Sequence, residues 1–120
     1  MEHRRKRLIF AGIAIVLLAG VAAFLLFREV TEANERTLQD QLLTLRAAID
    51  QYILDHHRPP KSSDHIVAAG YLKALPTDPF TGRSDTWVWQ ESGELGEPGI
   101  VDVRSGSNKK SRRGDRYSEW

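Results

Sequence analysis

Residues 8–27 read LIFAGIAIVLLAGVAAFLLF, a run of 20 residues without a charged or strongly polar side chain. At a rise of about 1.5 Å per residue, a helix of this length spans roughly 30 Å, the hydrocarbon thickness of a bilayer. Every face of such a helix is apolar, which excludes an amphipathic helix lying on a surface. A chain of 120 residues is also too short to bury this helix in a soluble core. The run therefore predicts a transmembrane helix.

The residues on either side of this run predict its orientation. Residues 4–7 read RRKR, whereas Arg28 and Glu29 follow the run directly. Because loops rich in Arg and Lys stay in the cytoplasm, residues 1–7 are expected to form a cytoplasmic basic tip. The alternative is a cleaved signal peptide, but its apolar region is normally shorter, and the nearest cleavage candidate, TEA at 31–33, is poor. We expect an uncleaved anchor at residues 8–27.

Length and composition exclude several classes of protein. The chain has 120 residues, no Cys and a net charge of +1. It is too short for a Rossmann fold or a TIM barrel, and without Cys it has no disulfide, zinc finger or thiol nucleophile. No phosphate-binding loop, glycine-flanked nucleophile or ordered catalytic triad stands out. We expect a protein that is not an enzyme and that needs no cofactor.

Residues 28–58 predict a helical stem that continues from the anchor. This segment contains no Gly or Pro, and Pro59 and Pro60 end it, because proline clashes with the preceding helical turn. One apolar stripe recurs along it at steps of four and three residues. The stripe consists of Leu38, Leu42, Leu45, Ile49 and Tyr52. Two heptads are short for a self-sufficient coiled coil, so the stripe is expected to hold the stem to a small head.

Residues 59–120 predict this head, which begins with a short helix. Ser62 or Ser63 is expected to cap the helix, Ile66 lies within it, and Gly70 ends it. A head of about 60 residues is too small to form a sufficient core alone. We therefore expect the stripe of the stem to complete the core.

Two strands are expected further along the head. TWVWQ at 86–90 and GIVDVR at 99–104 have the composition of strands, and the glycine-rich segment 92–99 predicts a hairpin connection between them. One stem helix packed on two or three antiparallel strands is an α+β arrangement. Trp87 and Trp89 share one face of the first strand, and whichever is exposed is a candidate partner surface.

The C-terminal segment is strongly basic. Residues 109–116 read KKSRRGDR, with five basic residues and one acidic residue. We expect a solvated, flexible loop, with docking on an acidic partner surface as the alternative. Nucleic acid is not an expected partner, since the predicted topology puts this loop outside the cytoplasm. Tyr117 and Trp120 are expected to fold back on the core of the head.

Five segments occur in an order that is typical of one family. They are LRAAIDQY at 45–52, RPP at 58–60, AGYLKALPTDPFTG at 69–82, GIVDVRSGS at 99–107 and YSEW at 117–120. Together with the membrane helix and the amphipathic stem, this pattern resembles the major pseudopilins of type II secretion systems and their type IV pilin relatives. The resemblance covers residues 38–107 well and the extreme C-terminus moderately.

The resemblance implies a pilin-like α+β fold and a non-enzymatic protein that supports secretion by helix-mediated assembly. Such a chain crosses the bacterial inner membrane once and carries its C-terminal domain in the periplasm. Its implied partners are the membrane and other pseudopilin or secretion-apparatus subunits, with which it forms a homo-oligomer or associates with a filament.

The N-terminus departs from the family pattern. The family is cut by prepilin peptidase after a glycine that precedes Phe-Thr-Leu-x-Glu, whereas this chain has RLIFAG at residues 7–12. Both the glycine and the glutamate inside the apolar run are missing. An ionised amine in a dry helix bundle needs such a carboxylate partner. The departure suggests an unprocessed member that stays in the membrane.

The C-terminal loop departs from the family as well. Major pseudopilins bind calcium there through acidic side chains and backbone oxygens, but residues 105–115 of this chain hold four basic residues. Calcium needs oxygen ligands, and four positive charges repel it. Ser107, Asn108 and Asp115 form at most a weak remnant of such a site, so we expect no metal.

A second hypothesis belongs to a different class of protein. A small single-pass scaffold, similar to short division proteins, would dimerise through its periplasmic stem helix. The uncut anchor and the stripe of the stem motivate it. The two hypotheses differ in what the stripe contacts, which is the head in the first and a second stem in the other.

Overall fold

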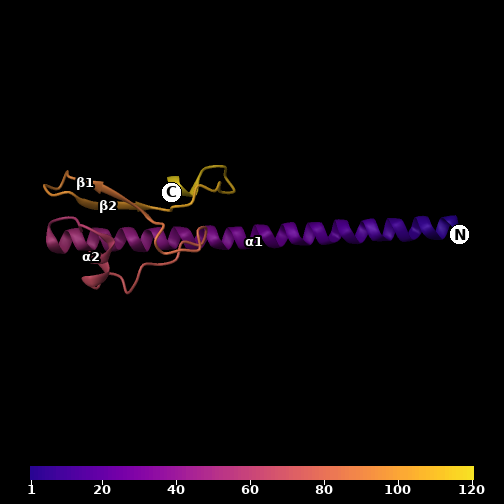
Figure 1. The fold of residues 1–120 in the computed structure, drawn as a ribbon, viewed down its shortest axis with the longest axis horizontal. Helices are drawn as coiled ribbons and strands as arrows, with labels where there is room; N and C mark the ends of the chain where they lie inside the picture. The colour runs from indigo at the N-terminus through magenta and orange to yellow at the C-terminus, as the bar shows by residue number, and fades with distance from the viewer. The chain divides into compact units, whose positions relative to one another are not determined.

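The structure, a computed structural model, describes residues 1–120. Its elements are α1 (Glu2–His56), α2 (Ser63–Ala68), β1 (Val88–Ser92), β2 (Gly99–Arg104) and the short 3-10 helix η1 (Tyr117–Glu119) (Figure 1). The chain divides into two compact units, Met1–Ala33 and Asn34–Trp120. A long helix followed by a small antiparallel sheet confirms the predicted α+β class.

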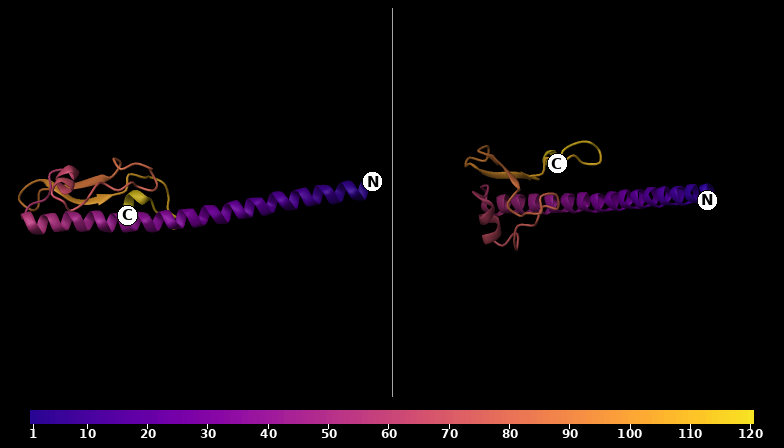
Figure 2. Two further views of the ribbon diagram at one scale, coloured as in Figure 1. Left: turned by 90° about the horizontal axis from the view of Figure 1, so that it is seen from below. Right: turned by 45° about the vertical axis from the view of Figure 1, so that its right-hand side comes forward.

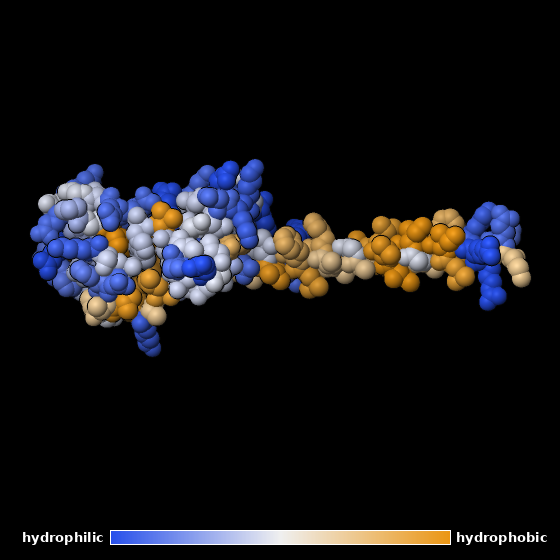
Figure 3. Space-filling view, viewed as in Figure 1, coloured by the Kyte–Doolittle hydropathy of each residue, from blue (hydrophilic) through white to orange (hydrophobic).

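The first unit contains the apolar run. Residues 8–27 are helical, and all of their side chains are exposed. The chain has one helix that is long and apolar enough to cross a membrane, with a mean hydropathy of 2.8 over an 18-residue window. Figure 3 shows this apolar stretch in orange. Length and composition thus fit a single-pass anchor, because lipid would supply the apolar surroundings that these side chains require.

The stem part of α1 provides one wall of the core in the second unit. Its buried apolar side chains are the whole predicted stripe together with Ala48. Leu38, Leu45 and Ile49 have no exposed surface. The side chains that cover the stripe are Ile66 of α2, Ile100 and Val103 of β2, and Trp87 and Tyr117. The stripe therefore packs against the head, as the short heptad pattern predicts.

β1 and β2 form an antiparallel hairpin in which Val88 pairs with Arg104 and Ser92 with Gly99. The register shifts between Gln90 and Glu91, so the ladder is irregular there. Both views of Figure 2 show the hairpin lying along the stem, with its turn near the end of α1. The predicted bounds of β2 and the hairpin connection are confirmed.

β1 begins two residues later than predicted. Thr86 and Trp87 precede the ladder because other contacts hold them. The Trp87 indole donates a hydrogen bond to the main-chain oxygen of Pro76 (2.8 Å), and the hydroxyls of Thr86 and Thr81 lie 2.7 Å apart. These contacts anchor the 76–82 loop against the core. Thr86 and Trp87 therefore contact this loop and do not pair with β2.

The turn after the stem also differs in detail from the prediction. α1 ends at His56, because His57 adopts a left-handed conformation with φ of 56°. Ser62 takes the predicted N-cap position of α2, but its side chain makes no capping hydrogen bond. Gly70, with φ of 86°, follows α2 as expected for a residue that ends a helix.

Candidate functional site

A buried carboxylate joins the stem to the C-terminal loop. Glu35, on α1, is only 7% exposed. Its Oε1 accepts hydrogen bonds from the main-chain nitrogen of Arg112 (3.0 Å) and from the Tyr117 hydroxyl (2.9 Å). Its Oε2 accepts a further hydrogen bond from Nε of Arg112 (3.0 Å). A carboxylate is stable in such a place because it is paired and hydrogen-bonded.

The two acids of this cluster titrate outside their ordinary ranges. Burial raises the pKa of the Glu35 carboxyl, but the hydrogen bonds from Arg112 and Tyr117 favour its charged form, so the pKa falls below its ordinary value. Burial, followed by the hydrogen bond to Glu35, raises the pKa of Tyr117 to about 12. At neutral pH, a protonated phenol therefore donates to an ionised carboxylate.

The Glu35 cluster predicts that acid destabilises the head. Since the pKa of Glu35 is lower in the folded state, its stabilisation is complete above the unfolded value of about 4.5 and is lost as the pH falls through the folded value. We expect Glu35→Gln to cost about 2 kcal/mol at pH 7. This cost should shrink as the pH falls below about 4.5, as measured by urea unfolding with tryptophan emission. A cost independent of pH would contradict the assignment.

Arg46 makes a second connection from the stem. Its Nε donates to Oδ1 of Asp102 on β2 (2.9 Å). One terminal nitrogen donates to the main-chain oxygens of Val103 (2.9 Å) and Trp120 (2.6 Å). One guanidinium thus ties α1, β2 and the residues after η1 together. Such fork-like hydrogen bonding is a property of Arg that Lys does not share.

Asp78 organises the segment LPTDP at residues 75–79 from inside the head. It has no exposed surface, and its Oδ1 accepts a hydrogen bond from the main-chain nitrogen of Phe80 (2.8 Å). Its Oδ2 accepts one from the Ser105 hydroxyl (2.5 Å). The Ser105 oxygen in turn accepts a hydrogen bond from the nitrogen of Ser107 (3.1 Å). The motif is therefore a buried link between the 76–82 loop and the end of β2.

Ser107 and Asn108, two residues of the expected calcium remnant, take part in the loop's own hydrogen bonds. Ser107 is 5% exposed, and its hydroxyl accepts a hydrogen bond from the main-chain nitrogen of Lys109 (3.2 Å). The main-chain oxygen of Asn108 accepts one from a guanidinium nitrogen of Arg116 (3.3 Å). Protein donors therefore already use these oxygens.

Asp115, the third of these residues, closes the loop. Its carboxylate accepts hydrogen bonds from the Ser111 hydroxyl and from Nε1 of Trp120 (3.0 Å), and it lies 3.6 Å from the guanidinium of Arg113. The Ser111 hydrogen bond is the main cause that lowers the pKa of Asp115. No three His, Asp or Glu side chains in residues 1–120 are grouped to hold a metal ion.

These contacts predict that the loop needs no divalent cation. We expect the melting temperature of the head to be the same, within about 1 °C, in excess EDTA and in millimolar calcium. The reason is that hydrogen bonds and ion pairs within the chain already satisfy the loop oxygens. Thermal unfolding followed by tryptophan emission tests this, and stabilisation by several degrees in calcium would overturn it.

The C-terminal loop is packed more closely than the sequence suggests. A solvated loop was expected, but Ser111 is 7% exposed and Tyr117 1% exposed. The Phe80 and Tyr117 rings stack with centroids 3.8 Å apart, and Trp120 meets the Tyr117 ring edge-on at 5.1 Å. Six of the eight residues at 109–116 are exposed, as a solvated loop predicts, but Ser111 is buried. The inward folding of Tyr117 and Trp120 is confirmed.

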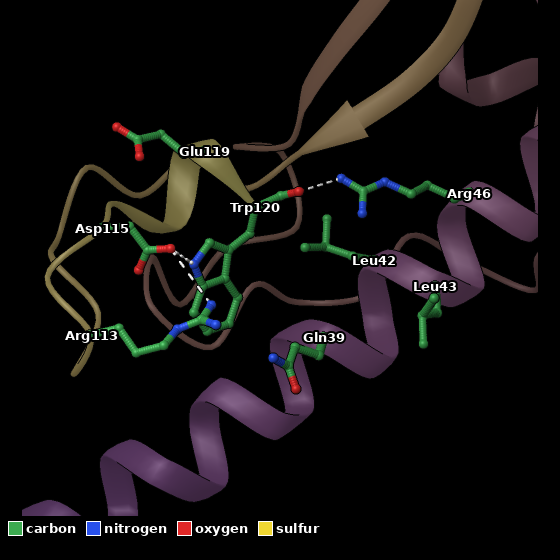
Figure 4. Close-up of a pocket in the computed structure, with 8 residues that line it drawn as sticks. All are labelled: Gln39, Leu42, Leu43, Arg46, Arg113, Asp115, Glu119 and Trp120. Carbon is green, nitrogen blue, oxygen red and sulfur yellow. Dashed lines mark hydrogen bonds and ion pairs between the residues drawn. The ribbon is translucent and has the colours of Figure 1, made fainter.

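A groove lies between the stem and the C-terminal residues (Figure 4). Its volume is about 480 Å³. Leu42, Leu43 and Trp120 give it apolar walls. The polar residues that line it are Gln39, Arg46, Arg113, Asp115 and Glu119. Leu43 is 66% exposed, so the groove presents an apolar side chain to its surroundings.

The two tryptophans proposed as a partner surface differ from each other. Trp87 is 5% exposed and belongs to the core, so it is not available to a partner. Trp89 is half-buried and packs against the same core. Their shared face points inward because the hairpin covers the stripe. The exposed residue of this segment is Val88 (46%), on the opposite face.

No protein-family model, curated protein or solved structure matches the chain. The functional residues are thus assigned from the geometry alone. Glu35 was missed in the sequence, although it lies three residues before Leu38 and so continues the spacing of the stripe. An acidic residue at a position that belongs to a buried stripe is the signal that identifies it.

Proposed function

We propose that this chain is a non-enzymatic, pseudopilin-like component of a type II secretion or type IV pilus-type apparatus. The observation that carries the proposal is the covering of the stem's stripe by a small α+β head. α1 contains both the apolar run and this stem, and the head covers the stem's buried side chains from Glu35 to Tyr52. The segment 69–82, which carries the resemblance most specifically, is built around buried Asp78.

We place the anchor in the bacterial inner membrane, with residues 1–7 in the cytoplasm and the head in the periplasm. The four basic residues at 4–7 support this orientation, since an excess of Arg and Lys marks the cytoplasmic side. In this arrangement the protein works by assembling with other pseudopilin or secretion-apparatus subunits, and not by turning over a substrate.

The scaffold hypothesis receives less support. It needs the stripe at an interface between two stems, yet Leu38, Leu45 and Ile49 are buried beneath the head of their own chain. A stem dimer through these residues would require the head to detach. This packing favours the pseudopilin-like proposal.

Deletion of the gene in its natural host tests the proposal. We expect the loss of a defined set of secreted proteins from the medium, restored by the full-length chain. A variant with an unfolded head, Leu42→Asp with Leu45→Asp, should not restore secretion. Ala47→Asp with Leu54→Asp, at two exposed positions of the same helix outside the groove, is the matched control for added charge and should restore it. An unchanged set of secreted proteins would refute the proposal.

The intact mass of the protein from host membranes tests its processing. We expect a mass near 13.6 kDa, which corresponds to a retained anchor. A loss of the first seven to twelve residues with an added methyl group would show that a peptidase accepts this N-terminus, and filament assembly would become the working hypothesis.

A further inference from the structure

A small hollow lies where the stem ends, at the turn between α1 and α2. Tyr52, Arg58, Pro59, Lys61 and His65 line it, and its volume is about 130 Å³. None of these residues is acidic. The groove in Figure 4 differs in this respect, because its positive and negative side chains are equal in number. The lining of the hollow therefore carries an excess of positive charge.

The basic side chains of the hollow have no partner within the chain. Arg58, Lys61 and His65 are exposed, and none of their side chains takes part in an ion pair or a hydrogen bond. Asp55 and Asp64, the nearest acids along the sequence, form no ion pair with them. Three donors at one hollow are thus free to bind an anion from outside the chain.

Lys61 also lines a second hollow, which contains Glu91 and Glu97. Neither glutamate forms an ion pair with it, so the Lys61 ammonium is not held on that side. Arg58 and His65 do not line the second hollow. The excess of positive charge therefore belongs to the first hollow.

The hydroxyl of Tyr52 is a further donor without a partner. Tyr52 is only 7% exposed, because its ring stacks on His56 (centroids 4.1 Å apart) and meets Tyr71 edge-on (5.7 Å). Its hydroxyl makes no hydrogen bond, yet Oε1 of Gln41 is the only fully buried side-chain atom of the chain that lacks a partner. The Tyr52 hydroxyl therefore keeps contact with solvent, and the hollow is an opening that Tyr52 lines.

The backbone around the hollow is held rigidly by the head. Pro59 and Pro60 are buried, and the main-chain oxygen of Pro60 accepts a hydrogen bond from the nitrogen of Ile100 (2.8 Å). Pro59 lies so close to Gly99 that a Cβ there would be 2.7 Å from the proline Cγ. The cationic residues that flank the two prolines therefore start from a fixed backbone, which lowers the entropic cost of binding a ligand.

We propose that this hollow binds a phosphate group, either as inorganic phosphate or as the terminal phosphate of a larger molecule. Arg58 and Lys61 supply two positive charges, which match a phosphate dianion, whereas a carboxylate would leave one of them unpaired. The planar guanidinium can donate two parallel hydrogen bonds to phosphate oxygens. The His65 ring adds an N–H in either tautomer, and Tyr52 adds its hydroxyl. The volume exceeds the roughly 30 Å³ that one water occupies, so the hollow has room for a small tetrahedral anion.

Titration of the ¹⁵N-labelled full-length chain with inorganic phosphate, in detergent micelles, tests the site. The amide signals of Arg58, Lys61 and His65 should shift and saturate, with a Kd on the order of 1 mM because the site is partly exposed. Sodium chloride at the same ionic strength should not reproduce these shifts. The absence of a saturable shift at these residues would overturn the proposal.

Replacing the two cations tests their part in binding. Arg58→Gln with Lys61→Gln should weaken phosphate binding at least about tenfold, because the charge-assisted hydrogen bonds are lost. Lys73→Gln with Lys110→Gln is the matched control, since it removes two exposed cations that do not line the hollow. It should leave the Kd unchanged. An equal loss of affinity in the two pairs would show unspecific attraction by net charge and would refute the site.

Tyr52→Phe tests the hydroxyl by itself. Because the hydroxyl makes no hydrogen bond within the chain and the ring is kept, the melting temperature without phosphate should change by less than about 4 °C. Phosphate binding should weaken about tenfold, since a hydrogen bond to a charged group is lost. An unchanged Kd would refute the assignment of this hydroxyl to the site.

A second titration with glycerol 3-phosphate distinguishes the two sources of the phosphate. A Kd at least about fivefold lower than that of inorganic phosphate would support a phosphate carried by a larger molecule, and an equal Kd would support free phosphate.

The site goes beyond the proposed function, and the two fail separately. Saturable phosphate binding in a chain whose deletion leaves secretion intact would retain the site and refute the secretion role. A deletion that abolishes secretion, together with no saturable shift, would retain that role and refute the site.

Discussion

Replacing Leu42 and Leu45 together by aspartate is expected to unfold the head. The two side chains are 2% and 0% exposed in the core beneath the hairpin. Losing each leucine costs about 2–5 kcal/mol, and each buried carboxylate adds a desolvation penalty of several kcal/mol. The sum exceeds the 5–15 kcal/mol that typically stabilises a domain. Tryptophan emission should be red-shifted before any denaturant is added, because Trp87 would become exposed.

Leu43→Asp with Leu54→Asp provides the matched control. It makes the same chemical change on the same helix, at two positions that are each 66% exposed. Surface changes of this kind stay within about 0.5 kcal/mol for each substitution. If the buried pair abolished self-association while the head kept its normal unfolding transition, the stripe would be a dimer interface, and the scaffold hypothesis would replace the pseudopilin-like proposal.

Replacing Gly106 by alanine adds only one methyl group, yet it is expected to destabilise the head strongly. A Cβ at Gly106 would lie 2.0 Å from the main-chain oxygen of Thr86, far inside van der Waals contact. Two backbone segments must therefore separate, and a flexible side chain cannot absorb the clash. We expect a cost of about 3 kcal/mol or more, at the upper end of the values for overpacked cores.

Thermal unfolding of the full-length chain measures this cost. A loss of 3 kcal/mol corresponds to a melting temperature lower by roughly 12–24 °C for a head of this size. Gly93→Ala is the control, since a Cβ there has no atom within 4 Å. Gly106 follows Ser105, so the displaced backbone should also weaken the buried hydrogen bond to Asp78. Equal melting temperatures for the two variants would contradict the close approach.

The sequence predicted those features of the fold that depend on local periodicity. The stripe from Leu38 to Tyr52 follows the helical repeat, and the head covers it as expected. The hairpin at 92–99 followed from glycine spacing and alternating apolar residues. The start of β1 was less predictable, because the partners of Thr86 and Trp87 lie in a distant loop.

The candidate site was only partly predictable. Leu42 and Trp120 were recognised as apolar packing residues, but the groove that they line depends on how the C-terminal loop packs. The basic loop was expected to be solvated because its charges dominate its composition. Its cations are exposed as expected, but a single buried carboxylate, Glu35, holds the loop to the stem by accepting hydrogen bonds from Arg112 and Tyr117. Composition cannot show a pairing between residues 77 positions apart.

The sequence by itself determined the apolar run, the stem with its stripe and the α+β class, because each depends on neighbours along the chain. Only the tertiary structure decided the burial of Trp87 and the roles of Glu35 and Asp78. Those features depend on which distant segments meet, since a carboxylate is buried only where donors from another segment surround it.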